Sequence, residues 1–471
     1  MILYKAQSLT KELEGFWEQI SQEIYNQQFS NISSKTLVEI YNQYEDWWEK
    51  DFLNSLLKRY DIEPICNLKN EIAFFMQEYV NDILYETDEE YMLHTAKFRR
   101  SFTRMQHIHN RVERMDIVKK ALEDDTNYSI IFKNMIEKRN ELIKQELNYK
   151  TISDFWIKHY QIDMNWVKKA CQDILKITSK SFSKLQREVI SSSTGSIDGL
   201  EIYDLLYASK YSPFDHLINN ESYSKILSVL KEYQLDITKG SIQIIRSTTA
   251  TSPSCLPISV PKNIKVILHQ SNSAEFFQSF LHELGHAIFY SNLNEKENIQ
   301  IKQLGFKGIT ESFAFYFQFL LMDENFLKKV QLTEEKNIEY VKNFYKWEFL
   351  RQLRLLCAKF LLSVYIFENE IEEEKLKVVF KDLFEDALKI KIQEDLSWFY
   401  YQDIKTLYEY LTGFIWGLNL SCNIGIKEIK NVKASLFQLA NDSDIPIYFI
   451  NNHLIDLSGL DYLNNLKEKF N

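Results

Sequence analysis

Glycine and proline are almost absent from the first 190 residues of this chain. Gly15 is the only glycine before Gly195, and Pro64 is the only proline before Pro213. Tight turns consume both residue types, so a sandwich or barrel of short strands is excluded. With eleven glycines and six prolines in 471 residues, the chain is expected to be mostly α-helical, with long helices and few sharp reversals.

The distribution of these residues also predicts where the chain divides. Most glycines and prolines follow the run Ser191-Ser-Ser-Thr-Gly-Ser196, which has the composition of a loop or linker. We therefore expect an N-terminal helical lobe over residues 1–195 and a second lobe over residues 196–471. Because 45% of the residues are hydrophobic, the chain has enough apolar material to form large cores in both lobes.

One region of the chain has the pattern of β-strands. The runs 241–245 and 258–268 contain β-branched residues, and Pro253, Pro257 and Pro261 punctuate them. This pattern predicts a small sheet with proline-bearing edge strands. Helical spacing then resumes over 273–291, 309–329, 333–366, 372–388, 402–422 and 430–440.

Charge and cysteine usage restrict the compartment and the partners. The net charge is −10, which opposes non-specific binding of nucleic acid. The five cysteines are scattered without a CxxC pair, so neither a disulfide framework nor a thiolate metal site is expected. The N-terminus has no signal-peptide pattern, and the longest apolar run, 313–322, is too short to span a bilayer. We expect a cytoplasmic protein with no membrane partner.

The sequence His282-Glu-Leu-Gly-His286 is an HExxH motif. On a helix, two histidines four residues apart share one face and can bind one Zn²⁺. Glu283 lies beside them, where it can accept a proton from a zinc-bound water. A metzincin would have glycine and histidine three and six residues after His286. Phe289 and Asn292 stand there, so that class is excluded.

The third zinc ligand is expected to be a carboxylate. Glu295 and Glu297 lie close to the motif, but they belong to a polar run that reads as an exposed loop. Glu311 opens the run 308–322, which is otherwise almost wholly apolar. A carboxylate at the start of such a buried helix is unfavourable unless it is paired or bound to metal. Glu311 is therefore the predicted ligand, and a first-turn carboxylate facing the helix dipole is the alternative.

The helix that carries the motif has two further signals. Asn272 and Glu275 form a capping pattern at its expected start. Gly285 lies inside the motif, and a glycine within a buried helix costs roughly 1 kcal/mol relative to alanine. We therefore expect another backbone, or the substrate, to approach the helix closely at Gly285.

Taken together, these segments resemble the oligoendopeptidase F and thimet oligopeptidase family of zinc peptidases. The motif is HELGHA, followed 25 residues after His286 by Glu311 in Glu-Ser-Phe-Ala. Weaker matches flank it, namely Ser254–Pro261, Leu350–Lys359 and Tyr408-Glu-Tyr410-Leu-Thr-Gly413. The resemblance covers roughly residues 200–425, and the first 190 residues match mainly in being helical.

The resemblance implies a two-lobed, mostly helical zinc peptidase with a deep cleft that admits short peptides. By this resemblance His282, His286 and Glu311 hold one zinc ion. Glu283 is the general base and then the acid that protonates the leaving amine. Tyr410, and with less support Tyr408, donate a hydrogen bond to the oxyanion or the substrate backbone. The strand near 260–268 is expected to pair with the bound peptide.

Two other functions remain open on the sequence. Family members usually carry a histidine about ten residues before the tyrosine segment, but Tyr400 stands near that position here. This difference is compatible with a weakly active or inactive relative that binds peptides. The third possibility is a metallocarboxypeptidase or dipeptidase of the same fold, which would release only terminal residues.

Overall fold

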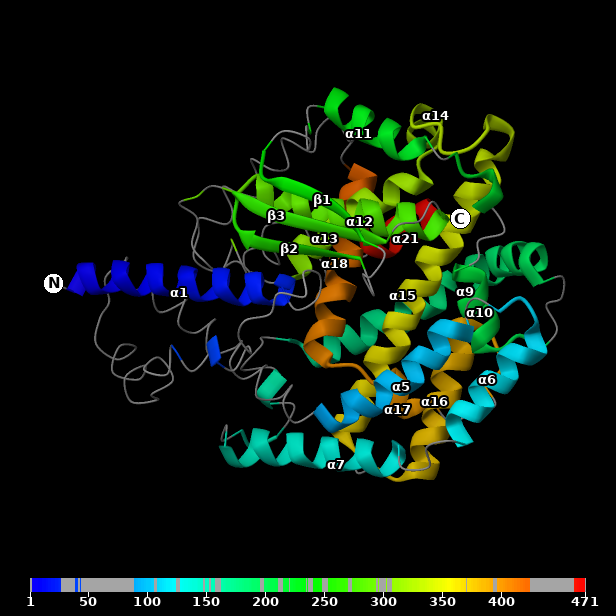
Figure 1. The fold of residues 1–471 in the computed structure, drawn as a ribbon. Helices are drawn as coiled ribbons and strands as arrows, with labels where there is room; N and C mark the ends of the chain where they lie inside the picture. The colour runs from blue at the N-terminus through cyan, green and yellow to red at the C-terminus, as the bar shows by residue number, and fades with distance from the viewer. Residues whose placement is uncertain are drawn as a thin grey trace.

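The computed structural model describes residues 2–26, most of 89–423 and 461–470, together with residues 39, 40 and 43. Within this part the chain is mostly helical and contains one three-stranded sheet (Figure 1). The expected fold class is therefore confirmed. The expected helix at 430–440 lies outside the described residues.

The helices of the first half are long, as the scarcity of glycine and proline predicts. They are α1 (Ile2–Tyr25), α5 (Glu89–Met105), α6 (Arg111–Glu123), α7 (Tyr128–Glu141) with the π-helical turn η3 (Leu142–Glu146), and α9 (Met164–Thr194). Aromatic side chains fill the contacts between these helices and later ones. The Tyr128 ring, for example, stacks on Trp398 with centroids 3.9 Å apart.

Helix α9 corrects the expected linker. Residues 191–194 are helical and form the last turn of α9, and the remainder of the expected linker lies outside the described residues. The Ser192 hydroxyl donates to the Glu188 carbonyl, 2.9 Å away, within the same helix. Serine can continue a helix when its hydroxyl bonds the carbonyl four residues earlier, so a serine-rich run alone does not end one.

The sheet contains β1 (Ile242–Ser247), β2 (Ser254–Ser259) and β3 (Asn263–His269) in the order β1-β3-β2. Strand β3 is central, parallel to β1 and antiparallel to β2. The run 258–268 contributes to two strands, β2 and β3, because the chain reverses between Ser259 and Asn263. Pro257 lies in β2, which is an edge strand, as expected for a proline.

The remaining helices build the second half. They are α10 (Ile202–Lys210), η4 (Asp215–Leu217), α11 (Ser222–Glu232), α12 (Ala274–Ser291), α13 (Lys307–Phe319), η6 (Leu320–Met322), α14 (Glu324–Lys329), η7 (Glu335–Asn337), α15 (Ile338–Glu368), α16 (Glu373–Leu388), α17 (Ser397–Tyr400), α18 (Ile404–Asn423) and α21 (Asp461–Phe470). The helix expected over 309–329 is broken. Asp323 begins a new helix there, because its carboxylate accepts from the Phe326 N–H at 2.7 Å.

The layers around the sheet place the HExxH motif in the interior. Helix α12 packs on β3 and β2, α13 packs between α12 and α18, and α15 contacts α9, α16 and α18. Figure 1 shows α15 running through the middle of the molecule, with the sheet on one side and α5, α16 and α17 on the other. The motif helix is thus covered by the sheet and by α13.

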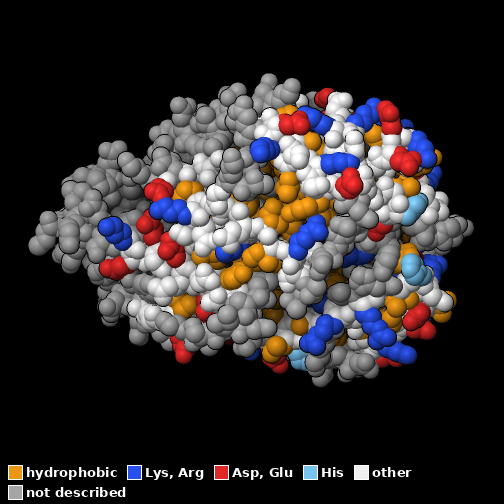
Figure 2. Space-filling view, turned by 45° about the horizontal axis from the view of Figure 1, so that its top comes forward, with side chains coloured by type: hydrophobic (Ala, Val, Ile, Leu, Met, Phe, Trp, Pro, Cys, Tyr) orange, Lys and Arg blue, Asp and Glu red, His pale blue; other side chains and the backbone are white. Residues whose placement is uncertain are grey.

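The described part of the face in Figure 2 is mixed in charge. On the described part of the face in Figure 2, Lys and Arg alternate with Asp and Glu, and hydrophobic side chains gather near the middle. None of the helices in the described part of the chain is both long and apolar enough to cross a lipid bilayer.

Candidate metal centre

Helix α12 presents the two histidines of the motif on one face. Its N-cap is Ser273, whose hydroxyl accepts from the Phe276 N–H at 3.1 Å, so the cap lies one residue after the expected Asn272. His282 and His286 follow one turn apart, with ring centroids separated by 4.9 Å and ring planes at 87°. Their spacing on the helix therefore brings both imidazoles to one place, as the motif predicts.

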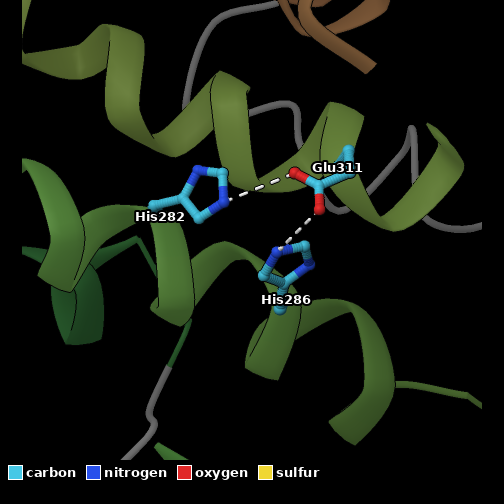
Figure 3. A group of neighbouring side chains, drawn as sticks. All are labelled: His282, His286 and Glu311. Atoms are coloured by element: carbon cyan, nitrogen blue, oxygen red, sulfur yellow. Dashed lines mark ion pairs between the residues drawn. The ribbon is translucent and has the colours of Figure 1, made fainter. Parts of the chain in front are cut away.

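Helix α13 brings the third side chain to the same place. Glu311 lies near the start of α13 and is 6% exposed. Its carboxylate oxygens lie 3.3 Å from Nε2 of His282 and 3.6 Å from Nε2 of His286. Figure 3 shows the carboxylate pointing between the two imidazoles. One ligand atom from each residue falls within a group no wider than 4.8 Å.

The close approach of α12 and α13 depends on Gly285. A Cβ atom at Gly285 would lie 2.5 Å from Cα of Ala314 and 2.6 Å from the carbonyl oxygen of Phe313. Such distances are shorter than van der Waals contact, so only glycine fits. The expected close approach at Gly285 is confirmed, and the approaching group is the backbone of the helix that carries Glu311.

The other nitrogen of each imidazole also faces α13. Nδ1 of His282 lies 3.1 Å from Oε1 of Gln318, and Nδ1 of His286 lies 2.7 Å from Oγ1 of Thr310. In each histidine, therefore, Nδ1 has a hydrogen-bond partner and Nε2 points toward Glu311. This is the orientation required for both Nε2 atoms to bind one ion.

The electrostatics of the site favour a cation. Burial lowers the pKa of His282, but the hydrogen bond and charge of Glu311 outweigh it and raise that pKa to about 9. Burial raises the pKa of Glu283 to about 7. Two imidazoles and a carboxylate are a typical protein donor set for Zn²⁺. The residues present therefore fit a divalent metal ion of this kind.

Glu283 lies beside the metal-binding group and next to the edge strand. The charges of His282 and Glu311 both act on its carboxylate, and the backbone N–H of Cys255 in β2 faces it. This N–H helps to stabilise the ionised form. Glu283 is thus close to the three ligand residues without being one of them, which suits a group that accepts and returns a proton.

The two tyrosines of the Tyr-Glu-Tyr segment face different surroundings. The Glu311 charge, then burial and Glu283, raise the pKa of Tyr410, so its phenol lies among the carboxylates of the site. Burial, followed by the charges of Asp163 and Glu409, raises the pKa of Tyr408 to about 12. Of the two, the structure brings only Tyr410 close to Glu311 and Glu283.

Strand β3, which corresponds to the segment expected to pair with a bound peptide, has no unpaired edge. Strand β3 is hydrogen-bonded to β1 on one side and β2 on the other. The prediction that the 260–268 segment pairs with a substrate is therefore wrong. The strand beside Glu283 that forms an edge of the sheet is β2.

Sequence reasoning missed Thr310 and Gln318. They are 6% and 3% exposed, and each contacts a histidine. The signal was available, because both are polar side chains within a helix whose other residues are mostly apolar. A buried polar residue requires a hydrogen-bond partner, and the nearest unexplained partners were the two histidines.

Comparison with other proteins supports the fold. No protein-family model matches this sequence, and a search of curated proteins finds no match. Solved structures of similar fold include the M32 carboxypeptidase of Deinococcus radiodurans, with 12% identity, a TM-score of 0.62 and coverage of 100% of this chain and 99% of that one.

Two further solved structures have a similar fold. A protein of Chlamydophila abortus described as a peptidase has 14% identity and a TM-score of 0.67, with coverage of 99% of this chain and 91% of that one. A protein described as an oligoendopeptidase F has 10% identity and a TM-score of 0.63, with coverage of 98% and 86%. The chain therefore has the fold that the M32 carboxypeptidase and the oligoendopeptidase F-like peptidases share.

Proposed function

We propose that this protein is a zinc-dependent peptidase that hydrolyses peptide bonds in short peptides. The observation that carries the proposal is the meeting of His282, His286 and Glu311, with their ligand atoms within 4.8 Å of one another. The fold supports it, because the chain resembles peptidases along nearly its whole length. His282, His286 and Glu311 would hold one zinc ion per chain.

The roles of the surrounding residues follow from their positions. A zinc ion held there would act as a Lewis acid, polarising the scissile carbonyl and lowering the pKa of water. Glu283 takes the proton from the attacking water and delivers it to the leaving amine. Tyr410 donates a hydrogen bond to the carbonyl oxygen as that oxygen gains negative charge. Its raised pKa keeps the phenol protonated at neutral pH, as a donor must be.

A second candidate function is that of a carboxypeptidase. It is favoured by the similarity to the M32 carboxypeptidase, which extends over 99% of that chain. Both functions use the same metal centre and differ only in how the ends of the substrate are accommodated. An inactive, peptide-binding relative is the third candidate, since Tyr400 stands near the position of the family histidine. Tyr400 is buried against Phe384, with ring centroids 5.0 Å apart.

One experiment separates these functions. The zinc-loaded protein is incubated with peptides of graded length, each with a free or an amidated C-terminus, and the products are identified by mass spectrometry. Internal cleavage of both kinds of peptide supports the oligopeptidase. Stepwise loss of C-terminal residues supports the carboxypeptidase if it occurs in the peptides with a free C-terminus and not in the amidated ones.

The same experiment contains its own controls. Glu283→Gln serves as the matched protein without a general base, and a chelator removes the metal. A protein that binds one zinc ion yet leaves every peptide intact would be the inactive relative. A protein that binds no metal would contradict the proposed function altogether.

A further inference from the structure

Helix α13 provides more than the third metal ligand. Thr310, Glu311 and Gln318 all lie on it, and all three side chains face the two histidines of α12. Gln318 follows Glu311 by seven residues, which is about two helical turns, so the two side chains share one side of the helix. The orientation of both imidazoles is therefore set by the same helix that supplies the carboxylate.

The two partners of the histidines are chemically distinctive. A metal-binding histidine commonly donates its second N–H to a carboxylate, a backbone carbonyl or water. Here Nδ1 of His282 faces the amide oxygen of Gln318 at 3.1 Å, and Nδ1 of His286 faces the hydroxyl of Thr310 at 2.7 Å. Both partners are neutral side chains.

We propose that Gln318 and Thr310 are positioning residues that fix the tautomers of His282 and His286 and thereby set the metal affinity of the site. The inference rests on the proposed metal centre and adds to it the residues that tune it. When Nδ1 carries the proton and donates a hydrogen bond to an acceptor on α13, the lone pair of Nε2 is directed at the ion. The amide oxygen of Gln318, which faces Nδ1 of His282 at 3.1 Å, can only accept, so this orientation of the amide requires the proton on Nδ1.

The neutrality of Gln318 has a further effect. A carboxylate at this position would accept a stronger, charge-assisted hydrogen bond from Nδ1. It would also make the imidazole a more basic ligand. With glutamine, the negative charge close to the ion comes instead from Glu311 and Glu283. Gln318 therefore holds the affinity for metal below the value that a glutamate would give.

The test measures zinc binding by full-length variants in competition with a chromophoric chelator. Gln318→Met keeps the length of the side chain and removes its acceptor, and Thr310→Val keeps the shape and removes the hydroxyl. Each is expected to weaken zinc binding about 10–100-fold. Gln318→Glu is expected to bind zinc more tightly than the wild type. Thr310→Ser keeps the hydroxyl and is expected to bind zinc as tightly as the wild type.

A matched control separates positioning from packing. Ser312 is also buried on α13, but its hydroxyl donates to the Ile309 carbonyl of its own helix, 2.6 Å away. Ser312→Ala is therefore expected to leave zinc binding unchanged. Thermal unfolding of the metal-free proteins reports any general loss of stability. The visible absorption spectrum of the cobalt-substituted proteins reports ligand geometry independently of peptide cleavage.

The outcomes distinguish this inference from the proposed function. If the wild type binds one zinc ion and Gln318→Met and Thr310→Val bind it equally well, the positioning role is wrong and the metal centre stands. The role is also wrong if Gln318→Glu folds normally and binds zinc more weakly than Gln318→Met. If the wild type binds no zinc, both this inference and the proposed function are overturned.

Discussion

Gly413 of α18 lies directly against Glu311 of α13. A Cβ atom at Gly413 would be 2.3 Å from Cβ of Glu311 and 3.2 Å from the Gly308 carbonyl oxygen. One turn later, a Cβ atom at Gly417 would be 2.7 Å from Cβ of Phe315. Two glycines one turn apart thus allow α18 to pack closely on α13, and the first of them lies against the residue that carries the carboxylate.

Substitution of Gly413 tests this packing. Gly413→Ala is expected to destabilise the protein by about 1–3 kcal/mol through overpacking. It should also weaken zinc binding, because the added methyl group displaces Glu311. Gly417→Ala introduces the same atom against Phe315 and is the matched control. It should lower the unfolding midpoint similarly, with a smaller effect on zinc affinity. Equal losses of zinc affinity in the two variants would contradict the special role of Gly413.

Glu283→Gln tests the general base. The variant should retain one zinc ion per chain, measured by elemental analysis, because Glu283 is not among the three ligand residues. Its turnover of a quenched peptide substrate should fall about 10²–10⁴-fold. Glu275→Gln lies two turns earlier on α12 and removes the ion pair with Lys210. That control should retain activity, and unchanged turnover by Glu283→Gln would refute the assignment.

The two tyrosines of α18 should differ in their effect on catalysis. Tyr410→Phe removes the phenol that lies near Glu311 and Glu283, and kcat should fall about 10²-fold with little change in zinc affinity. Tyr408→Phe removes a phenol on the same helix whose charged neighbours are Asp163 and Glu409. Its kcat should remain within a few-fold of the wild type. The reverse order of the two effects would show that the tyrosines have been assigned incorrectly.

The start of α12 should make stability depend on pH. Asp215 accepts from the Ala274 N–H at 2.8 Å, and burial raises its pKa to about 6, against the opposing effects of Ala274 and His216. An unfolded aspartate has a pKa of about 3.9. The folded state therefore holds this proton more tightly, and the stability it confers at low pH is lost as the pH rises from about 4 to about 6.

Asp215→Asn removes this titration and keeps a side-chain acceptor for the Ala274 N–H. The free energy of unfolding of the variant, relative to the wild type, should therefore increase between about pH 4 and pH 6 and stay constant above. Urea unfolding across this range measures it. Asp323 likewise accepts from a backbone N–H in the first turn of a helix, α14, but is exposed, so Asp323→Asn is the control. A difference for Asp215→Asn that does not vary with pH would contradict the prediction.

The meeting of the three candidate ligands is largely predictable from the sequence, because the signals for it are local. The spacing of His282 and His286 follows from helical geometry, and Glu311 stands out as a carboxylate in an apolar run. Gly285, a glycine within a buried helix, indicates a close contact at that position without identifying the contacting helix. Each of these inferences needs only the residue itself and the period of the helix that carries it.

The rest depends on which segments meet in space, which single residues do not encode. The alternation of β-branched residues in 258–268 predicts a strand but not its place in the sheet, where β3 is the central strand. The three serines at 191–193 and Thr194 are compatible with either a linker or the end of a helix. The roles of Thr310 and Gln318 required the knowledge that α13 packs on α12.

The packing of α13 between α12 and α18 has a consequence for the lifetime of the protein. An ion bound by His282, His286 and Glu311, as we propose, would join two helices that residues 292–306 connect along the chain, and would act as a removable cross-link. Its binding energy would add to the energy required to separate α13 from α12. The supply of metal would then govern how long this pair of helices resists opening, and with it the exposure of the chain to proteolysis.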